Sequence, residues 1–121
     1  MAEHLKTGQK GEKIARSYLQ EQSYQILEIN WRFQRAEVDI IAMKNDILVF
    51  IEVKTRTSNR WGNPEDSISP KKQSFIADAA SQYMEQINHQ WEVRFDVISI
   101  IIHDSHNYRL KHYPDAFFPG W

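Results

Sequence analysis

The sequence contains no cysteine in its 121 residues. Disulfide bonds, thiolate zinc sites and cysteine nucleophiles are therefore excluded. No apolar run approaches the roughly 20 residues that a membrane-spanning helix needs. The first residues also lack the charged-then-apolar order of a signal peptide. Together these absences predict a cytoplasmic protein that does not bind membranes.

Neither basic nor acidic residues are in large excess. Fifteen Lys and Arg residues against sixteen Asp and Glu residues give a net charge of −1, so the chain lacks the basic character of many nucleic-acid-binding domains. A local basic patch can still bind nucleic acid if acidic residues gather in a metal site. The length and a composition of 41% hydrophobic and 26% charged residues predict one globular domain over residues 1–121.

Several catalytic patterns are also missing from the sequence. No two histidines are four residues apart on a predicted helix, as zinc-binding helices require. We expect the histidines in turns, element ends and strand edges: His4, His89, His103, His106 and His112. There is no glycine-rich phosphate loop, and no serine on a nucleophile elbow has a candidate histidine partner. Zinc, P-loop and serine-hydrolase chemistry are therefore not indicated.

A β-hairpin over residues 37–54 organises the predicted fold. Two runs of β-branched and aliphatic residues flank a polar tip, and a two-residue turn at 45–46 would fix the pairing of the two strands. Side-chain alternation then gives one core face and one face that is apolar near the turn and charged at the open end. The core face is Val38, Ile40, Ala42, Ile47, Val49, Ile51 and Val53; the other is Glu37, Asp39, Ile41, Met43, Leu48, Phe50, Glu52 and Lys54.

The charged end of this hairpin is a candidate metal site. The assumed pairing sets Asp39 opposite Glu52, and Glu37 opposite Lys54. Like charges directly opposite each other on a sheet are destabilising, so something must offset the repulsion between Asp39 and Glu52. A divalent cation would do so, because Mg²⁺ takes oxygen ligands from one or two carboxylates. Lys54 lies on the same face and could reach a water or phosphate held there.

Helices are predicted on both sides of this strand-rich middle. The expected elements are a helix over 7–22 with Thr7 as N-cap, a strand over 24–33, the hairpin, a helix over 70–87 with Ser69 as N-cap, and strands over 93–102 and 108–113. Arg94 and Asp96 share one strand face and could pair. The apolar tail 116–121 could pack on its own domain or on a second subunit.

Four charged residues outside the hairpin strands have two interpretations each. Glu12, in the first turn of the first predicted helix, could complement the helix dipole or face the metal site. Lys72 lies in the first turn of the second helix, where a cation opposes the dipole, so a nearby phosphate would explain it. Arg56 and Arg60 follow the hairpin in a long loop, where they could contact phosphates or remain solvated.

The ordered set of motifs resembles the PD-(D/E)xK nuclease superfamily. Within it, the chain is similar to the YraN-like family of predicted bacterial endonucleases, which are themselves similar to archaeal Holliday-junction resolvases. The matching segments lie between about residues 8 and 102 and comprise 11–15, 37–42, 49–56, 70–72 and 94–97. Two positions depart from the family pattern. Ala36 stands where glycine is usual, and Val38 rather than proline precedes Asp39.

The resemblance implies an α/β, restriction-endonuclease-like fold with a mixed sheet flanked by helices in the order α-β-β-β-α-β. It implies a metal-dependent endonuclease acting on DNA, with branched DNA as one candidate substrate, and a possible homodimer. The implied site has Asp39 and Glu52 as ligands of Mg²⁺ or Mn²⁺, Lys54 as the catalytic lysine and Glu12 as a further catalytic acid, with Arg56, Arg60 and Lys72 as nucleic-acid-binding residues.

Two other functions stay open. The chain could be a non-catalytic nucleic-acid-binding module that keeps the nuclease fold, or a homodimeric structural protein whose acidic pocket is incidental. The presence of Asp39, Glu52 and Lys54 together favours the enzyme, because a binding module gains nothing from an acidic pair that faces a phosphate.

Overall fold

The computed structural model describes residues 2–57, 68–104 and 106–118. The elements are α1 (Ala2–Glu21), β1 (Gln25–Phe33), β2 (Ala36–Lys44), β3 (Ile47–Arg56), α2 (Pro70–Gln86), β4 (Val93–Ile102) and β5 (Tyr108–Tyr113). The strands form one sheet in the order β1-β2-β3-β4-β5, in which only the β3–β4 pair of the described strands is parallel. The predicted mixed sheet with flanking helices is confirmed, and β5 extends it at one edge.

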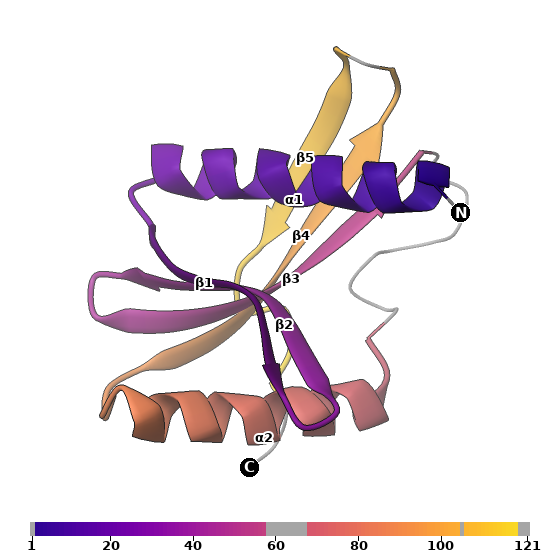
Figure 1. The fold of residues 1–121 in the computed structure, drawn as a ribbon. Helices are drawn as coiled ribbons and strands as arrows, with labels where there is room; N and C mark the ends of the chain where they lie inside the picture. The colour runs from indigo at the N-terminus through magenta and orange to yellow at the C-terminus, as the bar shows by residue number, and fades with distance from the viewer. Residues whose placement is uncertain (1, 58–67, 105, 119–121) are drawn as a thin grey trace.

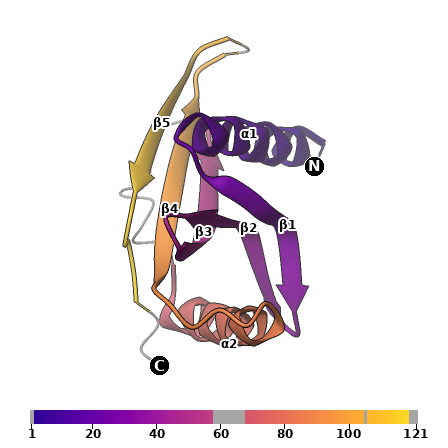
Figure 2. The same ribbon diagram turned by 90° about the vertical axis from the view of Figure 1, so that its left-hand side faces the viewer.

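The sheet is the middle layer between the two helices (Figure 1, Figure 2). The core under α1 contains Ala15, Leu19, Tyr24, Ile40, Ala42, Val49, Ile51, Ile98, Ile100 and Ile102. The core under α2 contains Ala36, Val38, Ile41, Leu48, Phe50, Ile76, Ala79, Ala80, Tyr83 and Phe95. The central strands therefore bury both faces, which explains why β3 and β4 are almost continuously apolar. Within the described ranges, neither helix is long and apolar enough to cross a bilayer.

The turn between β2 and β3 forms as predicted. Asn45 and Asp46 have φ angles of 51° and 66°, and two successive positive φ angles are what a type I′ hairpin turn requires. The predicted register is confirmed from the Lys44–Ile47 pair next to the turn as far as the Ile40–Ile51 pair.

Beyond that pair β2 and β3 part, and the described β2–β3 ladder ends. Residues 36–38 continue to pair with β1, whereas 52–56 pair with β4. The predicted facing of Glu37 and Lys54 is therefore wrong. Glu37 instead pairs with Arg32, with 2.7 Å between Nη2 and Oε2.

The β1–β2 ladder is irregular next to the point where β2 and β3 separate. The register shifts between Ile26 and Glu28, and Asn30 has a φ of 51°, so alternation along the strands is interrupted. Val38 consequently packs in the core under α2 while Ile40 packs under α1. The prediction that both lie on one face was wrong, because it assumed a straight ladder.

The two helices differ in how well the sequence located their starts. α2 begins at Pro70 with Ser69 as N-cap, as predicted, and the Ser69 hydroxyl accepts a hydrogen bond of 3.1 Å from the Lys72 N–H. α1 begins at Ala2, so the N-cap predicted at Thr7 is wrong. The preceding residues are adequate helix formers and the helix continues through them. Glu12 then lies in the helix interior, which removes its interpretation as a first-turn acid.

Gly11 allows α1 to approach β3 closely. A methyl group there would lie 1.9 Å from Oγ1 and 2.8 Å from Cβ of Thr55, and rotating the threonine side chain cannot relieve the second contact. Gly11→Ala is therefore expected to destabilise the protein by about 1–3 kcal/mol in urea denaturation.

Gly8→Ala is the matched control in the same helix. A methyl group at Gly8 would meet nothing within 4 Å, so this change should stabilise the protein by about 0.5–1 kcal/mol through helix propensity. Equal effects of the two substitutions would contradict the close approach at Gly11.

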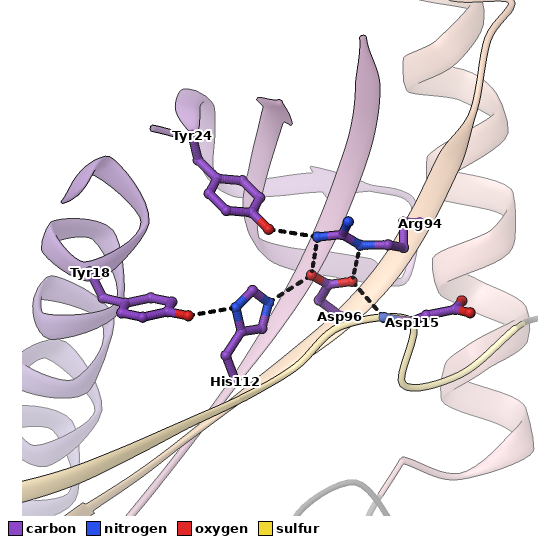
Figure 3. A network of polar contacts seen from close by, with 6 residues as sticks. All are labelled: Tyr18, Tyr24, Arg94, Asp96, His112 and Asp115. Atoms are coloured by element: carbon purple, nitrogen blue, oxygen red, sulfur yellow. Dashed lines mark hydrogen bonds and ion pairs between the residues drawn. The ribbon is translucent and has the colours of Figure 1, made fainter. Parts of the chain in front are cut away.

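A buried polar network lies where β4 meets β5 (Figure 3). Asp96 is fully buried and accepts hydrogen bonds of 2.9 and 2.8 Å from Arg94 and of 2.9 Å from the Asp115 N–H. His112 Nε2 lies 2.7 Å from Asp96 Oδ2. Burial alone would raise the pKa of Asp96, but the hydrogen bonds from His112, Arg94 and Asp115 outweigh it and lower that pKa. The predicted pairing of Arg94 with Asp96 is confirmed.

Two tyrosines extend the network to α1 and to the segment before β1. Arg94 donates a hydrogen bond of 2.6 Å to the Tyr24 hydroxyl, and His112 Nδ1 lies 2.9 Å from the Tyr18 hydroxyl. His112 thus has polar partners on both ring nitrogens (Figure 3). The network therefore joins segments that are far apart in the sequence.

Candidate metal and phosphate site

Asp39 and Glu52 line one cleft at the point where β2 and β3 part. The cleft has a volume of about 270 Å³ and is lined by Arg35, Ala36, Glu37, Asp39, Glu52, Lys72, Phe75 and Ile76. Its walls come from β2, from β3 and from the first half of α2. The structure therefore places both carboxylates in one cleft, although the directly opposed Asp39–Glu52 pair that the straight register predicts is not part of the described β2–β3 ladder.

The Asp39 carboxylate accepts a backbone hydrogen bond from β3 where the β2–β3 ladder has ended. Its Oδ2 accepts a hydrogen bond of 2.8 Å from the Val53 N–H, which lies just beyond the end of the β2–β3 ladder. Burial in the first place, and the negative charge of Glu52 in the second, raise the pKa of Asp39 to about 7 against the opposing effect of this hydrogen bond. Glu12 raises it further, so the acid on α1 is close enough to act on the site.

Glu52 is held between two lysines from different elements. The residue is 7% exposed. Its Oε1 forms an ion pair with Lys72 of α2 and lies 3.5 Å from Nζ of Lys54 of β3. The protein thus offsets part of the repulsion between Glu52 and Asp39 by itself. Lys72 likewise has a protein partner that explains its place at a helix N-terminus, where the sequence suggested a phosphate.

The two lysines differ in how firmly they hold their protons. Burial lowers the pKa of Lys54, and the nearby charge of Lys72 lowers it further, against the attraction of Glu52. Burial would lower the pKa of Lys72 too, but its hydrogen bond to Glu52 and the charge of Glu52 outweigh burial and raise it. Lys72 therefore acts as a fixed cation, and Lys54 is the lysine that gives up a proton more easily.

The remaining predicted phosphate-binding residues lie at the edge of this site or beyond the described chain. Arg56 is partly buried at the end of β3, two residues beyond Lys54. Arg60 lies outside the described residues. Thr55, between Lys54 and Arg56, packs against Gly11 of α1.

Sequence reasoning missed Arg35. It is exposed in the turn between β1 and β2 and lines the carboxylate cleft. The turn was treated only as a connector. A basic residue four positions before Asp39 is the signal that could have identified it.

The donor set of the cleft fits a hard divalent cation. Asp39 and Glu52 place two negative charges close together, and a cation would compete with the proton that the raised pKa keeps on Asp39. Mg²⁺ commonly binds one or two carboxylates and completes its shell with water and substrate phosphate, so the pair is sufficient. In the part of the chain that the structure describes, no group of three or more His, Cys, Asp or Glu side chains is arranged to hold a metal.

Asp39→Asn is expected to stabilise the metal-free protein at pH 8. The folded pKa of about 7 exceeds the ordinary value near 4, so stability contributed by this group falls as pH rises from about 4 through 7. Asparagine keeps an acceptor for the Val53 N–H and removes the charge. In urea denaturation with EDTA, the free energy of unfolding of the variant should exceed that of the wild type by about 1–3 kcal/mol at pH 8. This difference should become smaller towards pH 4.

The same assay tests metal binding. Free Mn²⁺ should stabilise the wild type by RT ln(1 + [Mn²⁺]/Kd), and the double variant Asp39→Asn, Glu52→Gln should not respond. Asp46→Asn, at the exposed turn of the same hairpin, is the control and should respond as the wild type does. An unaltered Mn²⁺ response of the double variant would show that the two carboxylates do not form the metal site.

Comparison with known proteins places the chain in a family. The model of the family described as "Uncharacterised protein family UPF0102" matches residues 11–100, which include Glu12, Asp39, Glu52, Lys54 and Lys72. A UPF0102 protein of Christiangramia forsetii is 45% identical over 118 residues, which cover 98% of both chains. One of Clostridium perfringens is 44% identical over 109 residues, covering 88% of this chain and 89% of the relative. One of Bacteroides thetaiotaomicron is 40% identical over 119 residues, covering 98% of both. With matches of this extent across the whole site, the chain belongs to the uncharacterised protein family UPF0102.

Proposed function

We propose that the protein is a metal-dependent endonuclease that hydrolyses phosphodiester bonds in DNA. The observation that carries the proposal is one cleft lined by Asp39, Glu52 and Lys72, with the Lys54 ammonium 3.5 Å from Glu52 Oε1. Two carboxylates for a hard cation and two lysines for a phosphate are the groups that phosphodiester hydrolysis requires. The resemblance to the PD-(D/E)xK superfamily points to the same reaction.

The four site residues would have different roles in the reaction. Asp39 and Glu52 would hold Mg²⁺ or Mn²⁺, which when bound supplies polarisation of the phosphoryl group and a lowered pKa of its water. Lys72, whose pKa is raised, would keep its charge and attract the phosphate. Lys54, whose pKa is lowered by burial, would orient the attacking water and hold or release a proton beside it.

Glu12 and the arginines would support this centre. Glu12 on α1 adds negative charge near Asp39 and would strengthen the attraction for a cation. Arg35 at the mouth of the cleft, Arg56 at the end of β3 and Arg60 would contact the DNA backbone. Because the net charge is −1, the affinity for DNA would come from these local cations and fall steeply with salt.

The direct test is a cleavage assay on linear, flapped and four-way DNA in Mg²⁺, in Mn²⁺ and in EDTA. We expect cleavage of at least one substrate in either metal and none in EDTA. A protein that binds these DNAs but cleaves none of them with any divalent metal would be a non-catalytic binding module instead.

We also propose that the protein acts as a symmetric dimer. β5 is an edge strand, and Phe118 beyond it is 66% exposed, whereas Phe117 packs on Phe95 of its own domain with ring centres 5.5 Å apart. Two-fold dimers are the commonest oligomers, and edge strands readily pair with a second chain. Light scattering at micromolar concentration should give the dimer mass, and Phe118→Ser should shift it towards the monomer. A wild type that stays monomeric would rule the dimer out.

A further inference from the structure

A second cleft adjoins the carboxylate cleft between the β1–β2 turn and α2. It has a volume of about 420 Å³ and is lined by Phe33, Gln34, Arg35, Ala36, Phe75 and Asp78. Arg35, Ala36 and Phe75 line both clefts, so the two lie side by side. Figures 1 and 2 show the β1–β2 turn beside α2 from two directions. A molecule held at the carboxylates could therefore extend directly into this second space.

Aromatic rings contribute to the lining of the second cleft from two different elements. Phe33 ends β1 and Phe75 lies on α2, and both are partly buried. Phe33 is kept in place by stacking on Trp31, with ring centres 6.3 Å apart and planes 9° from parallel. Ring surfaces of this kind stack with the flat faces of nucleobases, whatever the sequence.

Exposed polar groups complete the lining. Gln34 and Asp78 are exposed. The amide of glutamine both donates and accepts hydrogen bonds, and a carboxylate accepts them from base amino groups. Arg35, which belongs to both clefts, is placed to meet a phosphate between a base in one cleft and the carboxylates in the other. Stacking surfaces, an amide, a carboxylate and a bridging arginine together match a nucleotide better than a purely apolar ligand.

We propose that this second cleft, the base cleft, binds an unstacked base of the DNA strand whose phosphate lies at Asp39 and Glu52. A base inside a duplex is paired and stacked, and it cannot enter such a cleft unless it leaves the helix. The inference rests on the proposed nuclease function and narrows its substrate to DNA with an unpaired nucleotide next to the cut. Flaps and strand ends present such nucleotides without the cost of unpairing.

The test combines changes in the protein with removal of bases from the DNA. Affinity is measured by fluorescence anisotropy for a flapped DNA and for the same DNA with abasic nucleotides at the base of the flap, in Ca²⁺ so that the carboxylates hold a divalent cation. The wild type should bind the intact flap about tenfold more tightly than the abasic one, as expected for loss of stacking. Phe33→Leu, which keeps apolar volume without an aromatic face, should abolish most of that preference.

A second variant avoids the risk of disturbing the core. Gln34→Ala with Asp78→Ala removes only exposed side chains and should also reduce the preference for the intact flap. Trp91→Leu is the control, because Trp91 is 70% exposed in the connection between α2 and β4 and lines neither cleft. It should leave the preference for the intact flap and the affinity for fully paired DNA unchanged.

The base-cleft proposal would be wrong if both cleft variants kept the preference for the intact flap. It would also be wrong if the wild type showed no such preference. These outcomes are separate from a failure of the nuclease proposal. Cleavage without any preference for intact bases would leave the nuclease standing and remove the base cleft. A preference for intact bases without cleavage in any divalent metal would support the base cleft and contradict the nuclease proposal.

Discussion

Lys54→Ala is expected to slow DNA cleavage by about 10²–10³-fold in saturating Mg²⁺ while DNA affinity stays within about threefold of the wild type. The Lys54 ammonium is partly buried and lies 3.5 Å from Glu52 Oε1, so it acts at the carboxylate pair. Its lowered pKa suits a group that handles a proton during the reaction. Losing one phosphate contact among several changes affinity little. Single-turnover cleavage and anisotropy titrations measure the two quantities separately.

Two comparisons make this test specific. Lys111→Ala removes the same charge from the exposed face of β5 and should alter neither rate nor affinity. Removing Arg56 and Arg60 together should weaken DNA binding. It should also make the slope of log K against log salt concentration shallower by about 1.8, which is about 0.9 for each lost phosphate contact. Cleavage by Lys54→Ala at the wild-type rate would remove its catalytic assignment.

Asp96→Ala should lower the free energy of unfolding by about 3–5 kcal/mol, because it leaves buried partners without their acceptor. The Arg94 guanidinium loses two hydrogen bonds, and His112 and the Asp115 N–H lose one contact each. Urea denaturation at pH 7 measures the loss. Asp104→Ala is the control. Its carboxylate also accepts several hydrogen bonds, but it is exposed to solvent, and the loss should be much smaller.

The pH dependence separates the charge of Asp96 from its packing. Because the folded state lowers its pKa, the stabilisation is fully present above the ordinary value near 4 and is lost as pH falls through the folded pKa. Wild type and Asp96→Ala should therefore approach each other in stability in strongly acidic solution. A difference that stays constant from about pH 7 to pH 2 would show that lost packing, and not the charge, accounts for the effect.

The elements that depend on local patterns were predictable from the sequence. β4 and β5 have the bounds that alternation and β-branched residues indicate, and α2 starts at its Ser-Pro signal. The β2–β3 turn follows from residues that tolerate positive φ. The irregularity at Asn30 was not predictable, because counting along the strands assumes unbroken alternation. Val38 lies on the other face and Glu37 has a different partner than that count predicts.

The candidate site was predictable only in part, for the same reason. Counting along the hairpin brings Asp39 near Glu52, since both belong to one local unit. The ion pair of Glu52 with Lys72 and the place of Arg35 in the cleft depend on how α2 docks against the sheet. The pKa values of the two lysines also differ for a reason that depends on packing, because burial dominates at Lys54 whereas the hydrogen bond and charge of Glu52 outweigh burial at Lys72. No spacing in the sequence encodes these quantities.

The parting of β2 and β3 also determines when the site can exist during folding. Asp39 lies at the junction of a local hairpin, of the kind that forms within microseconds. Glu52 and Lys54 lie on the part of β3 that pairs with β4 in parallel, and this pairing requires closure of the long crossover that contains α2 and Lys72. Such non-local pairing is slow because the loop entropy is lost before the contacts form. The site is therefore completed by the late step, which brings Lys72 of α2 to the carboxylates of the hairpin.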